Sequence, residues 1–335
     1  MTRRRIGLVY DLLGSFPARP GDPLDVDAEY EPEATLALLE AAIRALGHEP
    51  VRLGAPADLL ARIGKGQLPA LDCALNIAEG TRGRDREAWA PVLLQLAGIP
   101  ALGSDALTLS ATLDKAWATR LVAAAGVPVP FQVVMRSAAA AQSAAASVRF
   151  PLFVKPRWEG SAKGIRVSSK VADPAALVRE VARIVRDYDQ PALVEAFLPG
   201  AEYTVTVVGN APPRALPVLQ RALDADTGIG IHAVERGLRS ERVAAAVTPG
   251  ELSAELEAEL SELALRSFEA LECLDFARAD FKLDATGRPL FLEMNPLPTF
   301  APDASFGILA ELAGRPVQAL VAEVLAAGLE RLELA

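Results

Sequence analysis

The chain has 335 residues, of which 51% are hydrophobic, and a formal net charge of −9 at pH 7. This length suffices for two or three domains with a large core, and the acidic balance argues against a broad surface for nucleic acid or for an anionic membrane. The two cysteines, Cys73 and Cys273, lie far apart in apolar segments, which argues against a disulfide framework and against structural zinc.

The N-terminus begins with basic residues and an apolar run that ends at Tyr10. This run is too short for the apolar part of a signal peptide, and no stretch of about 18 apolar residues occurs further along. We therefore expect no membrane span and a location in the cytoplasm.

The first hundred residues alternate between predicted strands and helices, which predicts a parallel sheet with helices on its faces. The elements, in order, are strand Ile6–Tyr10, helix Glu33–Leu46, strand Pro50–Leu53, helix Ala57–Ile63, strand Ala74–Ile77 and helix Arg86–Ala97. The segment Leu13–Tyr30 interrupts this rhythm. Because it is long for a connection, we interpret it as an active-site loop.

The remaining elements alternate less regularly. We predict helices at Ser110–Ala125, Ser137–Ser147, Pro174–Tyr188, Glu251–Leu271, Phe306–Leu312 and Val317–Leu332, and strands at Phe150–Pro156, Ala192–Phe197 and Tyr203–Val208.

A predicted hairpin, Phe276–Pro296, carries the most chemistry. Its two strands are joined by the turn Asp284–Gly287, and side chains on a strand alternate between two faces. One face is predicted to be apolar, with Ala277, Ala279, Phe281 and Leu283 on the first strand and Leu290, Leu292 and Met294 on the second. The other face carries Arg278, Asp280, Glu293 and Asn295. These oxygen ligands suit Mg²⁺, although a solvated hairpin face is the alternative interpretation.

Further charged residues lie at strand and helix ends. Lys155 ends an apolar strand and needs an anionic partner, and the Gly/Ser-rich loop Glu159–Gly164 follows it. Glycines allow backbone amides to approach phosphate oxygens, but such a loop is more often an ordinary turn. Lys115 could equally be an exposed lysine, and Glu195 and Glu202 could be charges at the rim of a sheet.

The order of these motifs along the chain resembles the ATP-grasp superfamily, and within it the D-alanine–D-alanine ligase family. The resemblance covers nearly the whole chain. It rests on V-K-P-R-W-E-G-S-A-K-G-I, V-E-A-F-L-P-G-A-E-Y-T-V, R-A-D-F, L-E-M-N-P, T-L-D-K and the early E-P-E-A-T-L.

The resemblance implies a role for each matching residue. Lys115 and Lys155 would bind the ATP phosphates, and the loop residues Glu159, Gly160, Ser161, Ala162 and Gly164 would close over them. We expect this loop to be mobile without nucleotide, because its amides would lack partners. Glu195, Ala196, Phe197 and Leu198 would hold the adenine and Glu202 the ribose.

The catalytic roles follow from the same resemblance. Asp280, Glu293 and Asn295 would hold two Mg²⁺ ions, for which Mn²⁺ could substitute. Arg278 would stabilise the tetrahedral intermediate, and Glu31 with Ser161 would bind the amino group of the first substrate.

The sequence departs from the family pattern in the substrate pockets. Glu79 stands where the family has histidine, and Thr299 replaces a glycine of the oxyanion site. Asp303 lies where a product carboxylate would be recognised, with Ser305 as an alternative contact. The segment Leu223–Val234 lacks the family's Tyr-x-x-Lys-Tyr motif and has Gly228, Gly230 and His232 instead. We therefore expect an amine substrate whose carboxylate is absent or masked, or one that is cationic.

The sequence thus predicts an α/β ligase of the ATP-grasp fold in three parts, residues 1–105, 106–194 and 195–335. These are an N-terminal parallel domain, a lid and a metal-bearing part, with ATP between two sheets. The predicted reaction joins a carboxylate to an amine and releases ADP, with D-alanine–D-alanine ligation as the leading activity. A ligase of another amino acid or natural-product acid is the alternative. A nucleotide-binding pseudoenzyme is an alternative of another class. The expected partners are amino-acid-like small molecules and a second copy in a homodimer.

Overall fold

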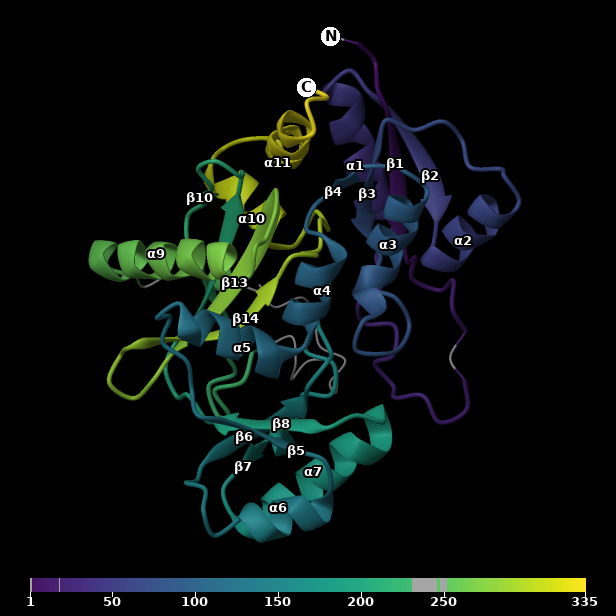
Figure 1. The fold of residues 1–335 in the computed structure, drawn as a ribbon. Coiled ribbons are helices and arrows are strands. Elements are labelled where there is room, and N and C mark those ends of the chain that lie inside the picture. The colour runs from purple at the N-terminus through teal and green to yellow at the C-terminus, as the bar shows by residue number, and fades with distance from the viewer. Residues whose placement is uncertain (1, 18, 231–245, 248–251) are drawn as a thin grey trace.

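A computed structural model of the chain describes residues 2–17, 19–230, 246–247 and 252–335 (Figure 1). Its described elements form three sheets, each covered by helices. In Figure 1 the N-terminal sheet lies at the right, a second sheet at the bottom and the third at the left.

The N-terminal sheet has the strand order β2-β1-β3-β4 and is parallel throughout. Its strands are β1 (Arg5–Tyr10), β2 (Glu49–Gly54), β3 (Cys73–Ile77) and β4 (Ala101–Leu102), with α1 (Glu33–Ala45), α2 (Pro56–Gly64), η1 (Arg86–Ala88) and α3 (Trp89–Leu96) between them. The predicted parallel sheet is confirmed. Because the carboxyl ends of parallel strands meet at one edge, the segments after β1 and β3 come together there.

The second sheet, which we call the lid sheet, is antiparallel with the order β5-β8-β6-β7. Its strands are β5 (Gln132–Met135), β6 (Leu152–Pro156), β7 (Lys170–Val171) and β8 (Ala192–Ala196). Figure 1 shows α6 (Ala138–Ala144) and α7 (Pro174–Tyr188) on its outer face, and η2 (Val167–Ser169) precedes β7. The inner face of the lid sheet is directed toward the rest of the molecule.

The third sheet has the order β12-β11-β9-β13-β14, with β10 paired to β9. Its strands are β9 (Glu202–Val208), β10 (Arg214–Ala215), β11 (Leu219–Arg221), β12 (Ala246–Val247), β13 (Phe276–Leu283) and β14 (Pro289–Asn295), and α9 (Ala254–Ala270) packs on it. The predicted hairpin is β13–β14.

The hairpin contains a β-bulge that corrects its predicted apolar face. Asp280 pairs with Glu293 while Phe281 pairs with Phe291, so Leu292 is an extra residue on β14. Alternation therefore reverses beyond the bulge. Phe291 and Met294 are buried in the core, whereas Leu292 lines the cavity beside Glu293. The prediction for β13 is confirmed, since Ala277, Ala279 and Phe281 are fully buried.

The predicted helix Ser110–Ala125 is wrong as one element, because it breaks at Asp114. The structure has α4 (Ala106–Leu113) and α5 (Lys115–Ala124) instead. Asp114 accepts a hydrogen bond from the Trp117 amide and ion-pairs with Arg157, Nε to Oδ1 at 2.7 Å. This cap starts a new helix with Lys115 in its first turn, which lets the Lys115 side chain enter the centre of the molecule.

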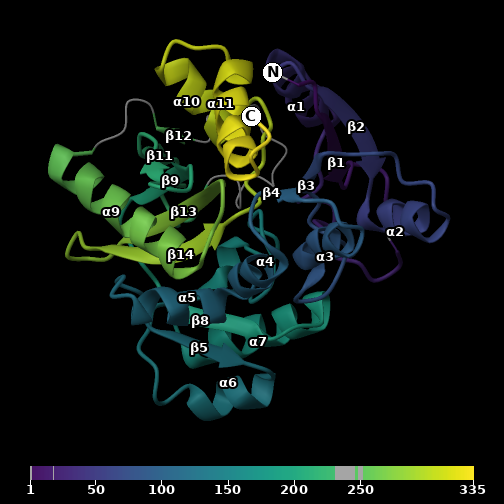
Figure 2. The same cartoon turned by 45° about the horizontal axis from the view of Figure 1, so that its top comes forward.

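The last two helices, α10 (Ser305–Leu312) and α11 (Val317–Arg331), return to the N-terminal sheet. One core cluster contains Ile6, Leu39 and Leu75 together with Phe306 and Val321. Both views show α11 beside the N-terminal part, with the two chain ends side by side (Figures 1 and 2).

The proposed boundaries at 105/106 and 194/195 remain a prediction. The packing of α5 against β14 joins the second predicted part to the third, and β8 runs across the second boundary. No single helix in the described residues has the length and apolar composition needed to cross a bilayer. The pair α10 and α11 meets those criteria only jointly and is bent by 112°.

Candidate active site

The inner faces of the lid sheet and the third sheet enclose a cavity of about 590 Å³. It gathers predicted site residues from all three parts of the chain. These are Glu31, Lys115, Lys155, Glu159, Ser161, Ala162, Glu195, Ala196, Phe197, Leu198, Glu202, Arg278, Asp280, Glu293, Thr299, Asp303 and Ser305. Gly160, Gly164, Glu79 and Asn295 do not line it.

Two lysines line the cavity, each paired with a carboxylate. Lys155 Nζ lies 2.8 Å from Glu195 Oε1, and Lys115 Nζ lies 2.8 Å from Glu293 Oε2. Burial alone would lower the pKa of Lys115, but Glu293 raises it. Likewise burial would raise the pKa of Glu293, but Lys115 and Lys155 lower it. Both groups are therefore charged at neutral pH, and neither Lys115 nor Glu195 is the exposed charge that the alternative interpretation allowed.

The hairpin presents its polar face to the cavity. Arg278 donates two hydrogen bonds to the Asp280 carboxylate, from Nε to Oδ1 at 3.1 Å and from Nη2 to Oδ2 at 2.8 Å. Thr204 Oγ1 donates to the same carboxylate at 2.7 Å. Two residues further along β13, Lys282 Nζ forms an ion pair with Glu202 Oε2 at 3.2 Å. The β13 strand therefore aligns three charged groups along one wall.

The two hairpin carboxylates fit a divalent cation better than Asn295 does. Asp280 and Glu293 face each other across β13 and β14 and both line the cavity. Oxygen ligands of this kind are those that Mg²⁺ prefers. The Asn295 oxygen accepts the Leu297 amide at 2.9 Å and lies outside the cavity lining. Asp280 and Glu293 thus have the donor set for Mg²⁺, and the Asn295 oxygen, which has two lone pairs, already uses one of them for the Leu297 amide.

The other end of the cavity holds Glu31. Its Oε2 accepts hydrogen bonds from Thr35 Oγ1 at 2.7 Å and from Thr299 Oγ1 at 3.0 Å. Burial raises the pKa of Glu31; its two threonine partners lower it, and the nearby Asp303 raises it further. No cation within the described residues forms an ion pair with Glu31, so a positively charged ligand would be stabilised there.

Glu79 does not line this cavity. It hydrogen-bonds Glu87, and burial and the charge of Glu87 raise the pKa of Glu79 well above its ordinary value. The structure therefore gives Glu79 a carboxyl partner instead of a place in the cavity wall.

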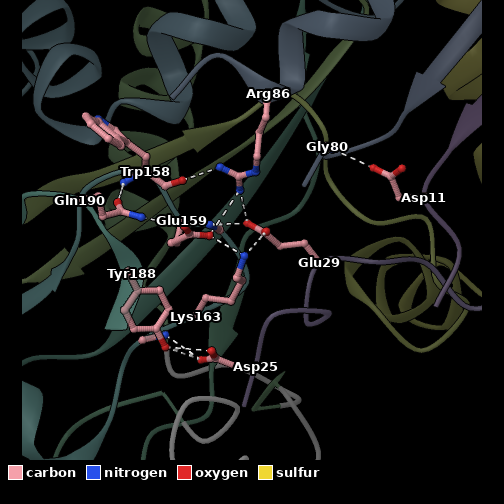
Figure 3. Close-up of polar contacts among 12 residues, drawn as sticks. Asp11, Asp25, Glu29, Gly80, Arg86, Trp158, Glu159, Lys163, Tyr188 and Gln190 are labelled. Atoms are coloured by element: carbon pink, nitrogen blue, oxygen red, sulfur yellow. Dashed lines mark hydrogen bonds and ion pairs between the residues drawn. The ribbon is translucent and has the colours of Figure 1, made fainter. Parts of the chain in front are cut away.

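Figure 3 shows how the Gly/Ser-rich loop is held by the segment after β1. Glu29 accepts hydrogen bonds from the Gly160 amide at 2.6 Å, from Arg86 Nη2 at 2.6 Å and from Lys163 Nζ at 2.8 Å. Asp25 accepts the Gly164 amide at 2.8 Å. We call this set of contacts the loop clamp. It corrects the expectation that the loop amides lack partners, because two carboxylates already occupy them.

The clamp requires glycine at both of its amides. A side chain at Gly160 would place its Cβ 2.8 Å from Glu29 Oε1, and one at Gly164 would meet Pro156 at 2.4 Å. Between them, Ser161 and Ala162 have φ angles of 47° and 57°, in the left-handed region that non-glycine residues rarely adopt. The clamp therefore holds a strained turn at the cavity mouth.

A family model described as "D-ala D-ala ligase C-terminus" matches residues 121–326. This range contains the lid sheet, Lys155 at the end of β6 and the whole hairpin, but not Lys115 on α5. The chain belongs to the D-alanine–D-alanine ligase family. It is therefore an enzyme of the ATP-grasp carboxylate–amine ligase class.

Relatives of this family match over most of their length. A D-alanine–D-alanine ligase of Ectopseudomonas mendocina is 33% identical over 291 residues, 86% of this chain and 87% of the relative. An uncharacterised protein, y4sG, of Sinorhizobium fredii is 30% identical over 92% of this chain and 91% of its own. The crystal structure of a D-alanine–D-alanine ligase from Bacillus anthracis complexed with ATP superposes with a TM-score of 0.69 at 20% identity, covering 98% of this chain and 99% of that one.

Four charged residues that line the cavity were not predicted from the sequence as site residues, namely Glu29, Lys163, Arg221 and Lys282. Lys282 follows Asp280 at the two-residue period of the hairpin, so alternation could have found it. Lys163 lies within the quoted loop, and Glu29 within the segment interpreted as an active-site loop. Arg221 lies on a short strand that no pattern predicted. His232 lies outside the described residues.

Proposed function

We propose that this chain is an ATP-dependent, ADP-forming ligase that joins the carboxylate of one amino acid to the amine of another, with D-alanine as the leading substrate. The observation that carries the proposal is the cavity in which Lys115, Lys155, Arg278, Asp280 and Glu293 converge. ATP would lie between the lid sheet and the third sheet, with its adenine toward β8 and its ribose near Glu202.

The first step is phosphoryl transfer. A donor carboxylate oxygen attacks the γ-phosphorus, the bond to the β-phosphate bridging oxygen breaks, and ADP leaves behind an acyl phosphate. Two anions must approach each other, so the ammonium groups of Lys115 and Lys155 are needed to offset their repulsion. Asp280 and Glu293 would hold Mg²⁺, which supplies further positive charge for the phosphate oxygens.

The second step is attack by the amine. The acceptor nitrogen bonds to the acyl carbon, a proton leaves the nitrogen, and inorganic phosphate is expelled. Negative charge develops on the carbonyl oxygen, and Arg278 lines the cavity next to the phosphate-binding residues. One well-placed donor at such an oxyanion is typically worth about 3–4 kcal/mol.

Glu31 supports an amino acid as the donor. Its carboxylate is buried and oriented by Thr35 and Thr299, and Ser161 also lines the cavity. An ammonium group placed there would gain a charge-assisted hydrogen bond.

A different acceptor is the second candidate, and Asp303 favours it. This exposed carboxylate lines the cavity end where an acceptor would enter, and its charge already raises the pKa of Glu31. An acceptor carboxylate beside it would be repelled, whereas an amide or a cationic amine would not.

One experiment distinguishes these candidates. Purified protein is incubated with Mg-ATP and single or paired D- and L-amino acids, D-alaninamide and diamines, with ADP release and product mass measured. A dipeptide of D-alanine supports the leading proposal, and a product formed only with neutral-ended or cationic acceptors supports the second. If no substrate or pair of substrates stimulates ADP release, both candidates are contradicted.

We further propose a homodimer located in the cytoplasm. Exposed apolar side chains cluster on α3 and α4, where Leu96 is 79% and Leu107 is 74% exposed, and a second copy would cover them. Both cysteines are buried and unpaired, as in proteins of reducing compartments. The molar mass in solution tests the dimer.

A further inference from the structure

Arg221 differs from every other cation that lines the cavity. Lys115, Lys155, Lys163, Arg278 and Lys282 each form an ion pair with a carboxylate. Arg221 also lines the cavity, but it forms no hydrogen bond or ion pair with any residue that the structure describes. Its five N–H donors are therefore available to a ligand.

The sheet register places Arg221 beside two charged residues of the cavity wall. On the cavity face, Arg221 of β11 lies opposite Glu202 of β9, which lies opposite Lys282 of β13. Opposite residues in an antiparallel sheet have Cβ atoms about 5 Å apart. Glu202 is the residue opposite Arg221, but its carboxylate forms an ion pair with Lys282 and none with Arg221.

The electrostatic surroundings indicate an anion. Burial lowers the pKa of Arg221, and the like charge of Arg278 lowers it further, while Asp280, Glu202 and Glu293 act in the opposite direction. A guanidinium nevertheless stays protonated in proteins. A largely buried charge without a partner is costly, and an arriving anion would remove that cost.

We propose that Arg221 binds the phosphoryl group that is transferred, by donating hydrogen bonds to the γ-phosphate oxygens of ATP. The planar guanidinium matches phosphate geometry in a bidentate manner. Its neighbours Arg278, Asp280 and Glu293 are the groups assigned to the reacting centre, whereas the adenine end at Glu195 is not among them. This inference rests on the proposed ATP-dependent reaction and adds a residue that stabilises the charge on the moving group.

The test compares nucleotides with and without a γ-phosphate. Calorimetric titrations with Mg-ADP and with the non-hydrolysable analogue Mg-AMP-PNP are carried out on wild type, Arg221→Gln and Arg221→Lys. Arg120→Gln is the matched control, because Arg120 is an exposed arginine of α5 outside the cavity. We expect Arg221→Gln to weaken AMP-PNP binding about tenfold or more while leaving ADP binding within twofold. Arg221→Lys should restore part of the loss.

Folding does not obscure this result. Because Arg221 has no bond to lose among the described residues and Arg278 repels it, Arg221→Gln should leave the thermal midpoint of the ligand-free protein unchanged or higher. A lowered midpoint would indicate a structural role and overturn the inference.

The remaining outcomes separate the inference from the proposed function. Equal weakening of both nucleotides, or of neither, overturns the assignment to the γ-phosphate. Unchanged nucleotide binding with a raised KM for D-alanine would assign Arg221 to the substrate carboxylate and also overturn it. Failure of wild type to bind either nucleotide would overturn the proposed function itself.

Discussion

Lys155 and Glu195 form a buried ion pair in the cavity to which we assign ATP. The two side chains are 7% and 5% exposed, so each charge relies on the other while no nucleotide is bound. A phosphate that attracts Lys155 must therefore leave Glu195 with another partner, and Gln132 already donates to it at 3.0 Å. Stability and nucleotide affinity are coupled at this position.

We predict that Lys155→Met destabilises the protein by about 3 kcal/mol, because it leaves Glu195 buried without its cation. The double variant Lys155→Met/Glu195→Leu should recover most of this stability but not the lost nucleotide affinity. Urea unfolding and nucleotide titration measure the two effects. If the double variant is as unstable as the single one, the pair does not act as described.

Glu87 provides a pH-dependent test at the same scale. Burial raises the pKa of Glu87 to about 7, although Arg86 opposes this shift. Between the unfolded pKa near 4.5 and pH 7, the folded state retains a proton that the unfolded state loses, so stability falls as pH rises through this window. One pKa unit corresponds to about 1.4 kcal/mol.

Glu87→Gln removes this titration, since the amide resembles the protonated acid. We predict that the variant gains about 2–3 kcal/mol over wild type on going from pH 5 to pH 8. Urea unfolding at both pH values measures the difference, with the exposed Glu311→Gln as control. A difference that does not change with pH would contradict the assignment.

At the scale of elements, the loop clamp connects the segment after β1 to the Gly/Ser-rich loop Glu159–Gly164. Burial would raise the pKa of Glu29, but Arg86 and Lys163 lower it, so Glu29 is ionised. Figure 3 shows four charged side chains together: Glu29 and Arg86 from the N-terminal part, and Glu159 and Lys163 from the Gly/Ser-rich loop. Lys163 lies between Glu29 and Glu159. We therefore expect the clamp to keep the Gly/Ser-rich loop ordered before ATP arrives.

We predict that the amides of residues 158–165 exchange slowly with solvent in the absence of nucleotide. Glu29→Gln weakens the Gly160 contact and should increase exchange in this segment by about tenfold or more. Hydrogen exchange with mass spectrometry measures this, with Glu311→Gln as control. Rapid exchange of the segment in wild type would show that the clamp does not hold the loop in solution.

At the scale of the whole molecule, Asp275 ties the N-terminal sheet to the C-terminal helix. This buried carboxylate accepts the Gly103 amide at 2.7 Å and Arg331 Nε at 2.6 Å, and Asn210 donates to it at 3.0 Å. It lies at the start of β13, so the hairpin is fixed relative to both. The position of Asp280 and Glu293 on the hairpin therefore depends on a contact far from the cavity.

We predict that Asp275→Asn lowers the free energy of unfolding by about 3 kcal/mol, because Arg331 loses its charge partner in a buried site. Urea unfolding followed by fluorescence measures the loss, and the exposed Asp226→Asn should be neutral. A change in the asparagine variant no larger than in the control would show that Asp275 contributes little.

The sequence by itself determined the features that repeat with a short period or depend on neighbouring residues. Alternation on β13 predicted that Arg278 and Asp280 share a face, and the βαβ rhythm predicted the parallel sheet. Glycines placed the ends of α1 and α3 within about one residue. The order of the motifs along the chain identified the family, because the motifs are those in which the family places its ATP-binding residues.

Tertiary structure decided what depends on distant packing. The bulge at Leu292 follows from pairing with β13, and the cap at Asp114 follows from its contact with Arg157. Glu29 reaches Gly160 across 131 residues, a contact that no local period encodes. Arg221 became significant only when its neighbours on the sheet were known to be paired with each other. Local patterns fix the conformation of an element, whereas the choice of partner is fixed by how elements pack.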